Sequence, residues 1–279
     1  RDLRMSRGLG DVYKRQHLGN NTLKENYGRP SKGAAYALRG MIYMWKKEYD
    51  SAIKDFEEVK KCGYDLWEGK YIDFFKYENE KDKEMILPLQ YDEASGYCDN
   101  IQLMVGSRDH YDCWTELIPS ADFVDYYRNA DGSEFKWSAY LTGWDDLTPA
   151  QREVFFLRNN LTSNQSAYND AKSRIGAEVM NKYYLDSGNE ARIKKAYESR
   201  DPRLQQTIIT PYSSTNCYSP YWNSGEPMQN KVLRWPYLNR GGNNGDMWHN
   251  QRNAGYYIYK KYNDCLLYTS PSPRDMRRS

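Results

Sequence analysis

The most regular alternation of apolar and polar positions in this chain lies between Ser31 and Gly63. Apolar or small side chains recur there at helical spacing on either side of a short polar break, at Tyr36, Gly40, Tyr43, Ala52, Phe56 and Val59. Ser31 is a typical N-cap and Cys62-Gly63 a typical C-terminal stop. The small residues let two antiparallel helices approach, while Tyr43 and Phe56 fill the groove between them. The spacing predicts a tetratricopeptide-type hairpin over 31–63, and other helices must pack on it because one repeat cannot bury its own apolar face.

Weaker patterns predict that the rest of the chain is mainly helical, with long loops. They favour short helices around 71–75 and 120–127, a helix opened by Pro149, and a helical stretch over 175–198 that stops at Arg200-Asp-Pro-Arg-Leu204. Asn129-Ala-Asp-Gly132 is a strong turn signal. For Arg200, Asp201 and Arg203 we expect a structural role, in which they cap a helix end and pair locally.

Other segments lack a helical period. Residues 85–91 are expected to be extended, and the stretch from there to Pro119 is polar and rich in turns. Beyond Pro211 the chain is aromatic and rich in Gly and Asn, with few helix signals. Long irregular stretches in a compact domain are usually functional or disordered. The fold class expected is therefore mainly α, built from tetratricopeptide-type hairpins as an α/α superhelix, with long loops and a few short strands.

The two ends of the chain carry an unusual coding signature. Asp11–Gln16 can be encoded by GATGTGTATAAGAGACAG and Cys265–Ser270 by TGTCTCTTATACACATCT, which are reverse complements apart from their end bases. An inverted repeat that brackets a reading frame resembles the transposon-end adaptors of sequencing libraries. We therefore expect 1–16 and 265–279 to be adaptor-derived rather than genuine tails, and 17–264 to be a domain truncated at both ends.

The tails alter the charge of the chain. The whole sequence has a net charge of +2 and a pI of about 8.1. The first tail holds five basic and two acidic side chains and the last holds three and one, so the stretch between them has a net charge of −3. Clustered Lys and Arg are the electrostatic footprint of nucleic-acid or anionic-membrane partners. Here the basic excess comes from the tails, and no nucleic-acid partner is expected.

The aromatic composition favours a hydrated binding surface rich in Tyr and Trp. The chain has 27 Tyr and 8 Trp but only 7 Phe. Tyr and Trp carry a polar group on an apolar ring, which suits a hydrated binding surface better than a dry core. No apolar run approaches the roughly 20 residues that cross a bilayer as a helix.

Motifs for catalysis or metal binding are missing from the sequence. It has no HExxH, P-loop, GxGxxG or GxSxG pattern, and His17, His110 and His249 are scattered. The cysteines show no CxxC spacing and are read as small buried side chains or, less often, a disulfide: Cys62, Cys98, Cys113 and Cys217. Asp145-Asp146 could suggest a glycosidase, whose two carboxylates lie about 5–10 Å apart. Adjacent aspartates point in different directions, so a solvated or capping role is favoured. No catalytic residue, metal or cofactor is expected.

The order of several short motifs resembles that of SusD/RagB proteins from about residue 30 to 262. The motifs are Lys32-Gly-Ala-Ala-Tyr-Ala-Leu-Arg-Gly40, Tyr49-Asp-Ser-Ala-Ile53, Gly63-Tyr-Asp-Leu66, Asn79-Glu80 with Glu84-Met-Ile86, Pro119-Ser120 with Val124-Asp125 and Asp131-Gly132, and Arg200-Asp-Pro-Arg-Leu204. The sequence departs from the family at Thr210-Pro-Tyr212, where Pro-Gly is more usual. The later helical repeats of the family are also missing.

The resemblance implies a non-enzymatic protein of Bacteroidetes-like bacteria. Family members are surface-exposed lipoproteins of the outer membrane, anchored through an N-terminal lipid that this fragment lacks. They cover a TonB-dependent, SusC-like transporter and capture oligosaccharide for import. Tetratricopeptide helices form the scaffold, and long loops form the ligand surface.

Aromatic residues in polar loops are the candidate glycan ligands. Sugar rings present apolar C–H faces that stack on Trp and Tyr, while polar side chains bind the hydroxyls. The candidates are Trp114, Tyr218, Tyr221, Trp222, Trp235 and Trp248. For each of them packing against the scaffold is the alternative, because Trp is usually highly buried. Core or repeat contacts are expected for Tyr36, Tyr43, Trp45 and Phe56.

Two other classes of function remain open. A tetratricopeptide adaptor would bind a peptide or protein on its helical face, but it should show tandem 34-residue units with short loops. A glycoside hydrolase would need paired carboxylates in an aromatic cleft. Only one repeat is evident here and the loops are long, so glycan capture is the leading hypothesis, with the adaptor second.

Overall fold

The computed structural model describes residues 18–24, 27–89, 104–106, 115–218, 227–238, 246 and 257–261. They belong to two compact units, residues 1–99 and 100–279. The described parts are mainly helical, with two small two-stranded sheets. This confirms the predicted fold class. No helix in these ranges is long and apolar enough to cross a membrane.

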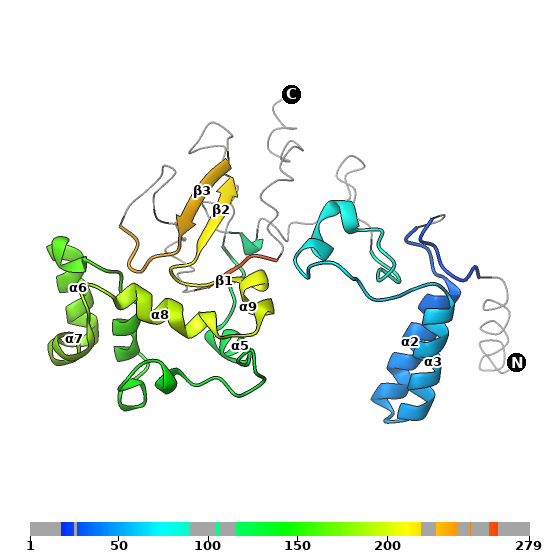
Figure 1. The fold of residues 1–279 in the computed structure, drawn as a ribbon, viewed down its shortest axis with the longest axis horizontal. Helices are drawn as coiled ribbons and strands as arrows, with labels where there is room; N and C mark the ends of the chain where they lie inside the picture. Colours follow the sequence, from blue (N-terminus) through cyan, green and yellow to red (C-terminus); the bar gives the residue numbers. More distant parts are fainter. Residues whose placement is uncertain are drawn as a thin grey trace, which may run out of the picture. The chain divides into compact units, whose positions relative to one another are not determined.

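The first unit contains the predicted helical hairpin, formed by α2 (Lys32–Trp45) and α3 (Tyr49–Lys61) (Figure 1). The Ser31 hydroxyl caps α2 by accepting a hydrogen bond from the amide of Ala34 at 3.1 Å. Past the end of α3, Gly63 adopts a φ of +95°, which favours glycine. The helices touch at Gly40, where an added Cβ would lie 2.6 Å from the ring of Phe56. The predicted roles of these residues are confirmed.

Polar and apolar contacts then fix the hairpin. Arg39 donates two hydrogen bonds of 2.5 Å to the buried carboxylate of Asp55 on the other helix. At the open end, Val59, Cys62 and Tyr64 form a small core, on which Tyr36 packs. Cys62 is a free, buried thiol, as one of the two sequence interpretations had it. The side chains of the other three interior cysteines lie outside the described residues.

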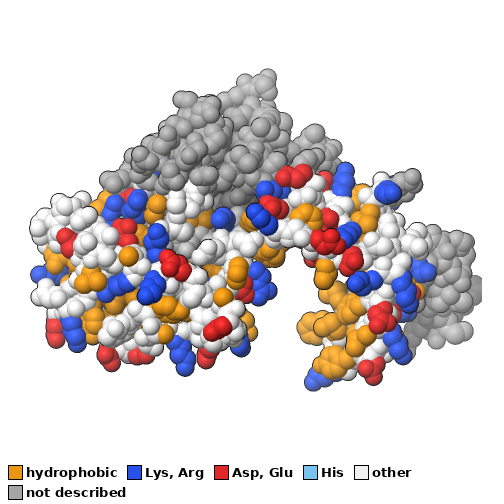
Figure 2. Space-filling view, in the orientation of Figure 1, with side chains coloured by type: hydrophobic (Ala, Val, Ile, Leu, Met, Phe, Trp, Pro, Cys, Tyr) orange, Lys and Arg blue, Asp and Glu red, His pale blue; other side chains and the backbone are white. Residues whose placement is uncertain are grey.

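One face of the hairpin carries exposed hydrophobic side chains. Figure 2 shows hydrophobic side chains gathered on α2 and α3, and the exposed ones include Leu38, Met41, Ile42, Met44, Trp45, Tyr49 and Ile53. The expectation that Trp45 makes core or repeat contacts is wrong for this chain, because its side chain is 88% exposed at the last residue of α2. That other helices must pack on this face stays a prediction.

The segment after the hairpin forms less helix than its sequence predicts. Instead of a helix around 71–75 there are two short 3-10 turns, η1 (Asp73–Phe75) and η2 (Tyr77–Asn79). Bulky rings lose rotamer freedom in a helix. Here they pack on one another instead, with Phe75 edge-on to both Tyr71 and Phe74 at 5.1 Å between ring centroids. The extended segment expected at 85–91 forms bends without strand pairing over 85–89.

The second unit combines short helices with two small sheets. Its α-helices include α5 (Ala121–Asp125), α6 (Gln165–Ile175), α7 (Ala177–Tyr183), α8 (Asn189–Glu198) and α9 (Pro202–Thr207). Its 3-10 helices are η3 (Trp137–Ala139), η4 (Trp144–Asp146), η5 (Gln151–Phe156) and η6 (Leu161–Ser163). The antiparallel strand pairs are β1 (Ile208–Ile209) with β4 (Ile258–Tyr259), and β2 (Ser214–Tyr218) with β3 (Pro227–Val232). In Figure 1, α8 runs between the α6–α7 pair and α9.

The core of this unit is built around η5. Val154, Phe155, Phe156 and Leu157 are all buried in it. The expected helix after Pro149 is therefore a 3-10 helix that ends at Phe156, and the next α-helix starts only at Gln165. The cause is long-range. The buried amide of Asn189 donates to the carbonyls of Val154, Phe155 and Leu157 at 3.1, 3.3 and 2.6 Å, which holds the chain in this conformation.

The helical stretch expected over 175–198 is divided in the structure. α6 ends at Ile175, α7 ends at Tyr183, and α8 begins at Asn189. Gly176 and Gly188 both have positive φ, at 102° and 95°, which places each of them at a helix boundary. Helical content was thus predicted correctly, but the two breaks were missed.

The Arg200-Asp201-Pro202-Arg203 motif has the predicted structural role. Asp201 caps α9 through the amide of Arg203 and pairs with its guanidinium. Arg200 is buried and donates to the carbonyls of Val124 and Tyr127 at the end of α5, at 2.6 and 2.8 Å. Burial lowers the pKa of Arg200, which the nearby Asp125 carboxylate partly opposes. Ser120 caps α5 by accepting a hydrogen bond from the amide of Phe123.

Candidate ligand-binding surface

The β2–β3 hairpin carries three of the candidate aromatics. Its register pairs Ser214 with Val232 at one end and Tyr218 with Pro227 at the other. In sequence, Tyr221 and Trp222 fall between the two strands. Both are outside the described residues, as is the side chain of Tyr218.

Trp235 follows β3 and is the candidate whose side chain is described. Its backbone pairs with Leu157 in a parallel bridge, and its carbonyl accepts the amide of Arg158 at 2.7 Å. Its indole nitrogen donates to the carboxylate of Glu153 at 2.9 Å, and its ring packs against the main core. Glu153 also pairs with Arg174 at 2.6 Å. Trp235 is therefore half-buried and held from both its backbone and its ring.

Asp246, two residues before Trp248 in sequence, is held by two arginines. Its carboxylate is fully buried and pairs with Arg158 at 2.5 Å and with Arg234 at 3.0 Å. It also accepts the amide of Leu238 at 3.1 Å. Trp248, two residues later, lies outside the described residues, and so does Trp114, which directly precedes the described Thr115. From the sequence, Asp246 was only a polar neighbour of Trp248, and its role as a buried anchor was missed because its partners are up to 88 residues away along the chain.

Other aromatic residues of this unit belong to the scaffold. Trp137 stacks on Trp144 with 5.0 Å between ring centroids, and its indole nitrogen donates to Asp125 at 2.9 Å. Burial raises the pKa of the Asp125 carboxyl. Asp145 and Asp146, next to Trp144, are both exposed, which agrees with the solvated role preferred for them. In the described ranges no three His, Cys, Asp or Glu side chains gather as metal ligands.

The structure also contains a surface pocket that the sequence reasoning missed. It has a volume of about 160 Å³ and lies between α8, α9, β1 and the start of β2. Its lining combines hydroxyl, amide and charged groups: Lys194, Glu198, Gln205, Thr210, Ser213, Ser214, Thr215 and Lys260, with Tyr197, Ile208, Ile209 and Pro211. We call it the α8–β2 pocket. Its residues come from four separate elements and share no motif, so no sequence pattern announced it.

The fold is that of a SusD-like protein. A crystal structure of a SusD-like protein from Bacteroides fragilis NCTC 9343 is similar, with a TM-score of 0.55 and 22% sequence identity. The match covers 95% of this chain and 43% of that one, so the chain spans less than half the length of that protein.

The sequence agrees with this fold. The model of the SusD family matches residues 66–278, so this chain belongs to the SusD family. No curated protein matches it. SusD family proteins are non-enzymatic binding proteins, generally glycan-binding partners of SusC transporters. The resemblance noted from the short motifs is therefore confirmed.

Proposed function

We propose that this chain is the glycan-capturing part of a surface-exposed outer-membrane lipoprotein. The protein binds oligosaccharide and passes it, without breaking a bond, to a TonB-dependent SusC-like transporter. The candidate contacts are the loop aromatics Trp114, Tyr218, Tyr221, Trp222, Trp235 and Trp248.

The observation that carries this proposal is how the aromatic segments are held. Trp235 forms a backbone bridge with Leu157 and a hydrogen bond with Glu153, and Asp246 forms ion pairs with Arg158 and Arg234. Binding sites on loops work when a rigid scaffold positions the ends of those loops. Because the anchors are buried ion pairs and backbone hydrogen bonds, the loops between them can differ in sequence while keeping their starting geometry. Recognition of a sugar by ring stacking requires that geometry and does not require a catalytic pair of carboxylates.

The test is affinity electrophoresis of the whole chain in gels that contain different polysaccharides. Trp222→Ala and Trp248→Ala remove candidate platforms, and Trp45→Ala is the matched control, since Trp45 is exposed in the other unit. We expect one glycan to retard the wild type, and each loop substitution to weaken binding about two- to tenfold, the value of one aromatic contact. Trp45→Ala should leave the retardation unchanged.

Three results would count against the proposal. The first is that no glycan retards the wild type, and the second is that Trp45→Ala loses as much retardation as the loop variants. The third is release of reducing sugar during binding. Trp235 needs a milder substitution, because Trp235→Ala also removes core packing and the hydrogen bond to Glu153. Trp235→Phe keeps most of the packing and tests what the larger indole ring contributes to glycan binding.

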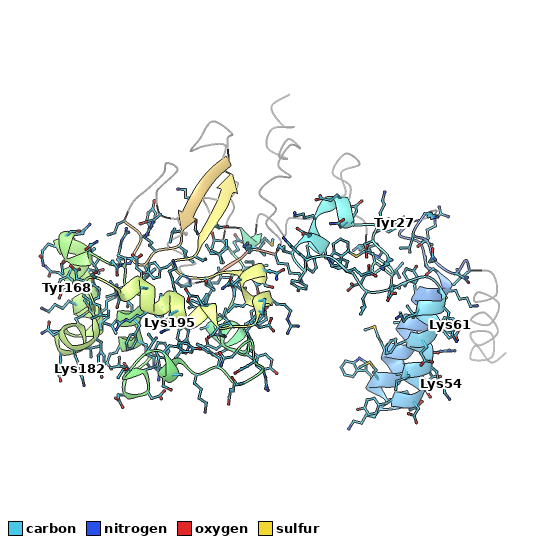
Figure 3. The ribbon with its side chains drawn as sticks, viewed as in Figure 1. Tyr27, Lys54, Lys61, Tyr168, Lys182 and Lys195 are labelled. Carbon is cyan, nitrogen blue, oxygen red and sulfur yellow. The ribbon has the colours of Figure 1, made fainter. Side chains whose placement is uncertain are left out.

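The exposed face of α2 and α3 favours a second candidate function, that of an adaptor for a peptide or protein helix. Leu38, Ile42 and Ile53 are each at least half exposed, and contiguous apolar patches of this kind mark interaction sites. Its test is Leu38→Glu with Ile42→Glu, against a control of Lys54→Glu on α3 (Figure 3). If the adaptor function holds, the double variant loses a helical partner and keeps glycan retardation. Unchanged partner binding would reject it.

A further inference from the structure

The backbone of Trp235 is fixed, which leaves the orientation of its ring to two side-chain torsions. Its carbonyl accepts the amide of Arg158 at 2.7 Å and the hydroxyl of Tyr212 at 3.3 Å, and its backbone pairs with Leu157 in a parallel bridge. The ring is then oriented by χ1 and χ2, and χ2 of tryptophan is a broad torsion without sharp staggered wells. A fixed backbone alone therefore does not fix the plane of the indole ring.

Glu153 supplies the further restraint at the edge of this ring. The indole has one polar hydrogen, on its nitrogen, and donates it to Oε1 of Glu153 at 2.9 Å. A hydrogen bond to a carboxylate is about twice as strong as one between neutral groups. The side chain of Glu153 is only 14% exposed, so water competes little for the contact. Rotation of the ring about χ2 breaks this hydrogen bond, and the bond therefore selects one orientation.

Arg174 restrains Glu153 in turn. Its guanidinium donates from Nη2 to Oε1 at 2.6 Å and, more loosely, from Nε to Oε2 at 3.5 Å. Oε1 therefore accepts both Arg174 and the indole of Trp235. The two partners come from elements that share the main core, since their neighbours Val154 of η5 and Ile175 of α6 are both buried in it. A chain of contacts thus leads from an arginine on α6 to the ring of a candidate glycan contact.

We propose that Glu153 and Arg174 are positioning residues for glycan binding, which hold the Trp235 ring as a preformed platform for a sugar. This inference rests on the proposed function, because Trp235 is one of its candidate contacts. A ring that is already oriented loses little freedom when a ligand binds, whereas a ring that must first be ordered weakens binding. Loss of the restraint should lower glycan affinity about two- to tenfold, the effect of ordering one side chain on binding.

A purely structural role for the ion pair makes a different prediction. The pair joins α6 to η5, but the Arg174 side chain is 41% exposed, and exposed ion pairs contribute little to stability. Arg174→Met should therefore leave the urea midpoint of unfolding close to that of the wild type and still weaken glycan binding. If the midpoint falls while glycan binding is unchanged, the pair only stabilises the fold, and the positioning role is overturned.

The indole N–H signal of Trp235 in a proton–nitrogen NMR spectrum reports the restraint itself. The chain has 8 Trp, and Trp235→Phe identifies the signal by removing it. Glu153→Met removes the acceptor, so the proton signal should move upfield and glycan affinity should fall. Glu153→Gln keeps an acceptor oxygen at the same distance along the side chain, and should restore part of both. A mere loss of stability leaves the signal of the folded chain where it was.

Two substitutions serve as controls, and both should keep the wild-type signal and the wild-type glycan binding. Asp170→Asn is the control within the network, because Asp170 also pairs with Arg174 but its side chain is 72% exposed. Lys195→Met is the control for the loss of a positive charge, because Lys195 is exposed on α8 of the same unit (Figure 3). Equal loss of binding in Lys195→Met and Arg174→Met would show that surface charge, and not the ring, governs affinity.

Binding is measured by affinity electrophoresis of the whole chain in the polysaccharide that retards the wild type most. If Glu153→Met binds as the wild type does while Trp222→Ala or Trp248→Ala binds less, the positioning role is overturned and the proposed function stands. Loss of affinity in Glu153→Met with an unmoved indole signal would show that Glu153 contacts the glycan directly, which also overturns it. If no polysaccharide retards the wild type, both proposals fall.

Discussion

Replacement of Asn189 should lower the stability of the second unit by more than its small side chain suggests. Its side chain is fully buried, and one amide group donates to three carbonyls at the end of η5. Asn189→Ala leaves these carbonyls without that donor, and an unsatisfied buried polar group costs about 1–3 kcal/mol. Some of the carbonyls will relax toward water, so the expected loss is about 3–5 kcal/mol of unfolding free energy.

The assay is urea unfolding followed by circular dichroism, where the midpoint should fall while the slope stays constant. In a thermal scan the same loss lowers Tm by roughly 2–4 °C per kcal/mol for a unit of this size. Asn169→Ala is the control, since Asn169 is exposed on α6 and accepts only Gln165 at 2.9 Å. Its effect should stay within about 0.5 kcal/mol. Equal midpoints for the two variants would refute the role given to Asn189.

Three further predictions concern local stability. Gly40→Val places a branched side chain where a Cβ alone meets the Phe56 ring at 2.6 Å, and should cost about 1–3 kcal/mol in urea unfolding. Asp201→Ala removes the cap of α9 and should cost about 1 kcal/mol, with Asp201→Asn close to wild type. The pKa of Asp186 is lowered chiefly by the hydroxyl of Thr162. Its stabilisation is therefore present above the unfolded pKa and is lost as pH falls below about 4, and Asp186→Asn should flatten that acid limb of the stability curve.

The hairpin could be predicted from sequence because its determinants are local. The cap at Ser31, the close contact at Gly40 and the left-handed Gly63 all act within or next to the helices that they define. Trp45 was misassigned for a related reason. Helical spacing tells which face a residue occupies, whereas burial of that face depends on what packs against it.

The second unit was predicted less well because its determinants are distant in sequence. The 3-10 conformation of η5 depends on Asn189, more than 30 residues later. β1 pairs with β4 about fifty residues away, and no local pattern encodes such a pairing. Among the candidate aromatics, composition identified the segments that carry them. The structure was needed to find the ion pairs of Asp246 with Arg158 and Arg234, which hold the ends of these segments.

The polar side chains buried in the second unit explain how it folds with little regular secondary structure. Short helices and two-residue strands leave many backbone groups without partners in regular structure. Asn189 and Arg200 satisfy such carbonyls, and Asp246 binds two guanidinium groups and an amide. A network of this kind is sensitive to the loss of any member, because each loss leaves a buried group unpaired. Under the proposed function, we expect ligand preference to change through loop residues while these buried anchors, and with them the fold, stay the same.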